Sequence, residues 1–148
     1  MPIADQVTEQ MKQAMKARDE RRLVALRSMR TAFLNEMKKD GSSSVSDAVC
    51  EGLLRKLEKQ RKESIEAFTN AGREELAAAE RAELAVIREF LPKLADEAKT
   101  REWVEAAIAQ TGATGGKDVG KVMGALMKAH KGEIDGDLAR RLVQERLG

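Results

Sequence analysis

The chain has 148 residues, of which 42% are hydrophobic, 35% are charged and only 3% are aromatic. It is long enough to bury a core without disulfides, and the shortage of aromatic residues excludes an all-β architecture. The single cysteine, Cys50, excludes an intramolecular disulfide, and no apolar run is long enough to cross a membrane. The composition therefore predicts an all-α intracellular protein, and the cytoplasm is the expected compartment.

Charge is unevenly distributed along the chain, although the net charge is only +2. Residues 12–62 carry 14 Lys/Arg against 7 Asp/Glu, whereas residues 63–113 carry 6 against 11. Two blocks of opposite sign can pair within the fold, which is the favoured interpretation, or the basic block can face an acidic partner such as RNA.

Four long helices are predicted in the first part of the chain, because apolar residues recur there at spacings of three and four. The expected apolar stripe of the first helix is Ile3, Val7, Met11 and Met15, and that of the second is Leu23, Leu26, Phe33 and Met37. Ser44 or Ser46 in the loop GSSSVSD suits the N-cap of the third helix. The helices are expected to end near Arg18, Gly41, Asn70 and Leu91.

Three shorter helices are predicted after Pro92, where glycines become frequent. They span about 97–110, 118–130 and 136–147, and Asp118 and Asp135 suit the N-caps of the last two. The sequence thus predicts an N-terminal four-helix bundle over 1–93 and a three-helix unit over 94–148. Trp103, Val122, Met127 and Leu142 are among the residues expected to face the core of the second unit.

Two arginines occupy unexpected positions in the second helix. Arg30 falls within the expected apolar stripe and Arg27 borders it. A buried guanidinium needs a partner, and Glu80 and Glu83 in the acidic fourth helix are the expected ones. A structural ion pair is therefore favoured over a ligand-binding arginine.

Gly120 and Gly124 stand four residues apart on one face of the sixth helix. Each costs about 1 kcal/mol relative to alanine in an exposed helix, so a compensating close approach is expected. Packing of a neighbouring helix is the favoured explanation, and contact with a nucleic-acid backbone is the alternative.

The sequence offers no recognisable catalytic or metal-binding constellation. The one histidine, His130, stands 80 positions after Cys50, so neither a metal site nor a cysteine–histidine pair is expected. Gly115, Gly116 and Lys117 lack the spacing and the preceding strand of a phosphate-binding loop. No cofactor is expected.

A series of short motifs resembles the YqeY family over nearly the whole chain. In the first unit the matching residues are Asp19, Arg22, Leu26-Arg27, Asn35-Glu36, Lys59-Gln60-Arg61-Lys62-Glu63-Ser64, Ala71-Gly72-Arg73, Glu83 and Leu91-Pro92. In the second they are Gly120-Lys121-Val122-Met123, Leu126-Met127, Lys131-Gly132, Asp135-Gly136 and Leu142-Val143. Each motif alone is weak, and their shared order and spacing give the resemblance its specificity.

The C-terminal unit is also similar to the tail domain of the GatB component of the glutamine-dependent aspartyl/glutamyl-tRNA amidotransferase. That resemblance implies contact with tRNA, or with a protein of the tRNA-charging machinery. In that enzyme the carbon–nitrogen ligase chemistry belongs to other parts of the assembly that this chain does not contain, so the resemblance implies no reaction here.

A basic edge in the second unit is the candidate nucleic-acid site. It consists of Lys117, Lys121, Lys128, Lys131, Arg140 and Arg141. No aromatic residue lies between these charges, so contact with backbone and shape is expected rather than base stacking. The alternatives are a protein-interaction module unrelated to RNA and, third, a component of an amidotransferase system. The sequence does not specify an oligomeric state.

Overall fold

The computed structural model describes all residues from 1 to 148, and its regular elements are helices. The prediction of an all-α protein is therefore confirmed. No helix combines the length and the apolar character needed to span a membrane. The elements are α1 (Ile3–Ala17), α2 (Glu20–Asp40), α3 (Asp47–Asn70), α4 (Glu74–Arg88), α5 (Glu97–Thr111), the short 3₁₀ helix η1 (Gly116–Asp118), α6 (Val119–Ala129) and α7 (Gly136–Leu147).

The helices belong to two compact units. The first covers Met1–Leu91 and the second covers Pro92–Gly148. Each unit has its own cluster of buried hydrophobic residues. We expect the two units to unfold independently of each other.

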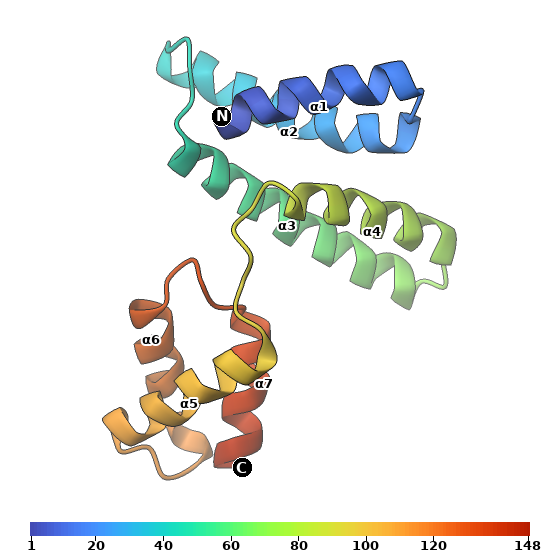
Figure 1. Cartoon of the computed structure of the whole chain (residues 1–148). Helices are drawn as coiled ribbons and strands as arrows, with labels where there is room; N and C mark the ends of the chain where they lie inside the picture. The colour runs from blue at the N-terminus through green and yellow to red at the C-terminus, as the bar shows by residue number, and fades with distance from the viewer. The chain divides into compact units, whose positions relative to one another are not determined.

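The first unit is built from two helical hairpins, α1 with α2 and α3 with α4 (Figure 1). Local signals set the helix ends: Asp19 accepts a hydrogen bond from Arg22 N–H at 3.1 Å, and Ser46 accepts one from Val49 N–H at 3.3 Å. Gly41 ends α2 with a φ of 68°, a conformation that favours glycine. Asp47 Oδ1 accepts the Ile3 N–H at 2.9 Å, which ties the start of α1 to the start of α3.

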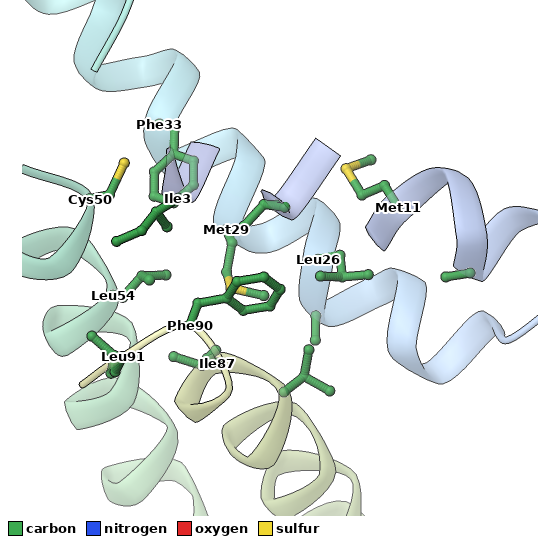
Figure 2. Packing of buried hydrophobic residues seen from close by; sticks show 14 of the residues in the cluster. Ile3, Met11, Leu26, Met29, Phe33, Cys50, Leu54, Ile87, Phe90 and Leu91 are labelled. Atoms are coloured by element: carbon green, nitrogen blue, oxygen red, sulfur yellow. The ribbon is translucent and has the colours of Figure 1, made fainter. Parts of the chain in front are cut away.

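The core of the first unit lies where α1 and α2 meet α3 and the end of α4. Figure 2 shows Leu26, Met29 and Phe33 of α2 turned towards Leu54 of α3 and Ile87 of α4. Several large apolar residues lie at the surface instead, among them Met15 of the stripe predicted for the first helix. Met15, Leu34, Val49 and Leu76 are all more than one-third exposed, whereas the smaller Ala14, Ala25, Cys50 and Ala77 are buried in their place.

The second unit packs α5, α6 and α7 around a separate cluster that includes Val104, Val122, Leu126 and Leu142. Asp135 caps α7 as predicted, accepting the N–H groups of Asp137 and Leu138. Asp118 does not cap α6, because its Oδ2 instead accepts the Thr114 N–H at 3.0 Å and closes the preceding loop. The prediction that Met127 faces the core is also wrong, since it is 41% exposed.

Candidate nucleic-acid interface

Four lysines form an exposed edge along α6. Lys121 and Lys128 project from the helix, Lys117 lies in η1 before it, and Lys131 lies in the turn after it. All four are exposed, and none of them makes an ion pair with a carboxylate of the chain. We call these four residues the lysine edge. Its ammonium groups are exposed and can contact a ligand.

Two glycines leave the adjacent surface of α6 bare. A Cβ added at Gly120 or at Gly124 would meet no heavy atom of another part of the chain within 4 Å. The expectation that a neighbouring helix packs on these glycines is therefore wrong. Because residues three and four apart are neighbours on a helix surface, Gly120 adjoins Gly124, and Gly124 adjoins both Lys121 and Lys128. The result is a strip of accessible backbone beside free ammonium groups.

The two arginines predicted to extend the basic edge behave differently. Arg140 is exposed on α7 and makes no ion pair. Arg141 pairs with Glu97 of α5 at 2.5 Å and with Glu145 at 2.9 Å, which raises the pKa of its guanidinium. Arg146 is held in the same way by Glu105 at 2.8 Å. The cations without an ion pair in the segment from η1 to α7 are thus the four lysines and Arg140.

One carboxylate next to the lysine edge already has partners. Asp118 accepts a hydrogen bond from the Thr114 N–H. This bond is the main cause of a lowered pKa of the Asp118 carboxyl, and the Gly115 N–H, Lys117 and Lys121 contribute less. The group therefore stays ionised and partly offsets the charge of the first two lysines. Lys128 and Lys131 lie at the other end of α6, and neither makes an ion pair with a carboxylate.

The C-terminal end of α6 is held by an aromatic stack. The rings of Trp103 and His130 lie parallel, with centroids 3.8 Å apart and an interplanar angle of 8°. His130 Nδ1 also lies 3.8 Å from a carboxylate oxygen of Glu133. Nearby, the Ala95 N–H donates to the Glu133 carbonyl at 2.8 Å. These contacts fix the turn that carries Lys131.

The ion pair predicted for Arg27 and Arg30 is not formed. Both residues are exposed, and Glu80 and Glu83 pair instead with Arg61 of α3. The reason is the orientation of α2: its buried face is centred on Ala25, Leu26, Met29 and Phe33, which leaves Arg27 and Arg30 with Leu34 on the outer side. The arginine of α2 that does find a carboxylate is Arg22, which makes two hydrogen bonds to Glu89, at 2.7 and 3.1 Å.

A buried glutamate on α3 was not anticipated. Glu58 is only 7% exposed, and its carboxylate is held by Arg55 at 3.2 Å and by Arg88 of α4 at 3.0 Å. Burial raises the pKa of this carboxyl, but the hydrogen bonds from Arg88 and Arg55 outweigh it and leave the pKa below its ordinary value. Glu58 stands four residues after Leu54, which itself follows Cys50 by four. That spacing is the signal in the sequence that could have revealed it.

No group of three or more His, Cys, Asp or Glu side chains lies close enough together to hold a metal ion. Cys50 is buried in the first core, where burial is the main cause of a raised pKa of its thiol. The one histidine, His130, is stacked on Trp103.

Comparison with known proteins points to one family. A sequence model described as Yqey-like protein matches residues 4–147. The chain is also similar to a protein named Altered inheritance of mitochondria protein 41, mitochondrial, from Pyrenophora tritici-repentis (strain Pt-1C-BFP). The two are 28% identical over 141 residues, which cover 93% of this chain and 77% of the relative. The cytoplasmic location expected for this chain stays a prediction.

Proposed function

The chain belongs to the family of Yqey-like proteins, and from that premise we propose that it is an accessory protein that binds folded tRNA through the lysine edge of its second unit. The proposal assigns it no reaction of its own. It draws on the resemblance of this unit to an amidotransferase tail domain, and it names α6 as the contacting element.

The observation that carries the proposal is the bare strip of Gly120 and Gly124 beside unpaired lysines. Glycine weakens an exposed helix, and no packing inside the chain offsets that cost. A ligand that approaches the helix backbone closely would offset it. The phosphate backbone of a nucleic acid suits such a surface, because it can lie along the glycines while its charges meet Lys121 and Lys128.

The expected mode of contact is backbone and shape rather than base recognition. The only tryptophan is occupied by His130, and the lysine edge contains no aromatic side chain on which a base could stack. Lysine is a flexible point charge, which suits phosphates at varied positions better than a fixed base edge. A folded tRNA offers such a surface without requiring a particular sequence.

The test is a salt titration of tRNA binding with matched variants. We would measure the affinity of the full chain for uncharged tRNA at several salt concentrations, and repeat this for a Lys121→Ala/Lys128→Ala variant. The slope of log affinity against log salt should shrink by about two when two phosphate contacts are lost. The control is Lys99→Ala/Arg101→Ala, which removes the same charge from α5, where both cations already lie near carboxylates.

Two results would count against the proposal. One is tRNA binding that does not depend on salt, and the other is an equal loss of affinity in the α5 control. A further comparison with heparin separates recognition of a folded RNA from a general attraction to polyanions. The proposal requires tRNA to bind more tightly than heparin at equal charge concentration.

A further inference from the structure

The outer face of α2 combines exposed apolar residues with cations that have no partner. Val24 is 50% exposed and Leu34 is 45% exposed. Arg27, Arg30 and Lys38 lie on the same side of the helix, and none of them makes an ion pair. The acidic residue within this stretch, Glu36, follows Leu34 by two positions and therefore lies on the opposite side of the helix.

Two hollows flank Leu34 on this face. One, of about 600 Å³, lies between α2, the start of α1 and the loop before α3, and Arg30 and Phe33 line it. The other, of about 650 Å³, lies on the side of Thr31, Lys38 and Gly41. Leu34, Met37 and Ser43 line both hollows, so the two form one continuous surface, which we call the α2 groove.

We propose that the α2 groove docks an amphipathic helix of a partner protein, one that places apolar side chains around Leu34 and Met37 and carboxylates against Arg27, Arg30 and Lys38. The basis of the proposal is charge complementarity. Arg30 and Lys38 line the groove, Arg27 lies one helical turn before Arg30, and none of the three makes an ion pair with a carboxylate. The α2 groove belongs to the first unit and the lysine edge to the second, and this proposal does not depend on tRNA binding.

The other wall of the groove sets the orientation of the occupant. Asp5 of α1 and Asp47 of α3 also line the first hollow. Asp47 is engaged by the Ile3 N–H, whereas Asp5 is exposed on α1. A docked helix must therefore turn its acidic edge towards α2 and a neutral or basic edge towards α1. A uniformly acidic segment would be repelled by Asp5.

A protein helix fits this surface better than RNA. The centre of the groove is apolar, being formed by Leu34, Met37 and part of Phe33, whereas RNA offers mainly charged phosphate and ribose there. An amphipathic helix buries apolar anchors at three- and four-residue spacing in grooves of this kind. An apolar anchor in the groove would cover the exposed Leu34 side chain, whereas a phosphate contact would leave it in water.

The experiment is a selection from a library of random peptides about 18 residues long, a length that can form a helix on binding. The full chain is the bait, and a Leu34→Glu variant is used for counter-selection. Enriched peptides should show leucine-like residues at helical spacing and an acidic edge. Their affinity for the native chain should fall at least about tenfold with Leu34→Glu and with Arg30→Glu/Lys38→Glu.

Matched controls make the result specific to this face. Leu76→Glu changes a leucine of α4 that is 39% exposed, and Lys12→Glu reverses an exposed charge on α1. Both variants should bind the peptides unchanged. Circular dichroism checks that every variant is folded.

Absence of Leu34-dependent peptides, or enrichment of basic ones, would overturn the proposal. So would a loss of tRNA affinity in Arg30→Glu/Lys38→Glu that is greater than the loss in Lys121→Ala/Lys128→Ala, because the groove would then be an RNA surface.

Discussion

In the first unit, carboxylates of α3 and α4 form ion pairs with arginines of the same two helices. In the second unit, by contrast, the lysines along α6 form no ion pairs. Glu58 binds Arg55 and Arg88, and Arg61 lies between Glu80 and Glu83. Lys121 and Lys128 make no ion pair, although the charge of Lys121 interacts with that of the Asp118 carboxylate. Charge is therefore part of the packing between α3 and α4, and part of a free surface on α6.

The difference follows from residue type and burial. A buried carboxylate must keep its partners, because an uncompensated buried charge costs several kcal/mol, and arginine can serve two oxygens at once. An exposed lysine carries no such requirement, because water solvates its ammonium group. The comparison thus predicts that substitutions on α3 and α4 change stability, whereas substitutions along α6 change binding.

The largest expected effect tests whether the two units unfold separately. Leu26 is fully buried in the first core, and Leu26→Ala should lower the free energy of unfolding of that unit by about 3 kcal/mol through lost burial and a new cavity. Trp103, the only tryptophan, belongs to the second unit and should report an unchanged transition by fluorescence. Circular dichroism should show the loss. Val24→Ala, on the exposed side of α2, is the control and should change stability by less than about 0.5 kcal/mol. An equal shift of both signals would show one cooperative structure.

The second effect concerns Glu58. Glu58→Gln keeps the shape of the side chain but removes the charge that Arg55 and Arg88 contact, and should cost about 1–2 kcal/mol. The larger free-energy cost of breaking a fully buried ion pair does not apply here, because Arg88 is half exposed and solvent screens its charge. Glu63→Gln on the same helix changes an exposed glutamate without an ion pair and is the control. Chemical denaturation of the two variants measures the difference.

The same residue sets a pH dependence with a definite sign. The pKa of the Glu58 carboxyl is lower in the folded protein than its ordinary value. Its ionised form therefore stabilises the first unit at neutral pH, and this contribution is lost as the pH falls through the lowered pKa. Glu58→Gln should flatten the fall of stability on acidification, relative to Glu63→Gln. A steeper fall in the variant would contradict the assignment.

Helix ends could be predicted from the sequence because the signals for them are local. Asp19, Gly41, Ser46 and Asp135 act on backbone groups within three or four residues, and all four mark helix ends in the structure. The buried face of α2 could not be predicted in the same way. The periodicity of its large side chains places Arg30 within the apolar stripe, whereas packing against α1 and α4 turns the helix so that the small Ala25 is buried.

The sequence predicts where the lysines of the candidate site lie, but it does not predict which cations form ion pairs. The lysines recur at helical spacing, so their shared edge follows from the sequence alone. The ion pair of Arg141 could not be predicted from the sequence alone, because its partner Glu97 lies 44 positions earlier in the chain. Similarly, Glu80 and Glu83 were expected to hold a cation, and only the tertiary arrangement shows that it is Arg61 of the adjacent α3.

A further prediction separates stability from binding on α6. Gly120→Ala/Gly124→Ala should raise the stability of the second unit by up to about 1 kcal/mol for each residue, because both sites are exposed, helical and open. The same methyl groups should weaken tRNA binding if the ligand approaches the helix backbone. Gly52→Ala on α3 is the control, since it is equally open and should stabilise the first unit without changing tRNA affinity. A gain of stability with unchanged affinity would show that the glycines are not part of the contact.

The smallest expected effect is at the stack that ends α6. Trp103 lies flat against His130 at 3.8 Å, so His130→Ala removes the covering ring and exposes the indole to water. Aromatic pairs contribute about 0.5–1.5 kcal/mol beyond their burial, and the half-buried position of this pair favours the lower end. We expect a red shift of the Trp103 emission and a small loss of stability, confined to the transition that fluorescence reports. His130→Phe keeps a flat ring without the nitrogens and should restore the stability.

The turn that carries Lys131 is fixed by the same contacts, so His130→Ala should also weaken tRNA binding slightly, whereas His130→Phe should not. If both variants weakened it equally, the imidazole itself would be part of the RNA contact.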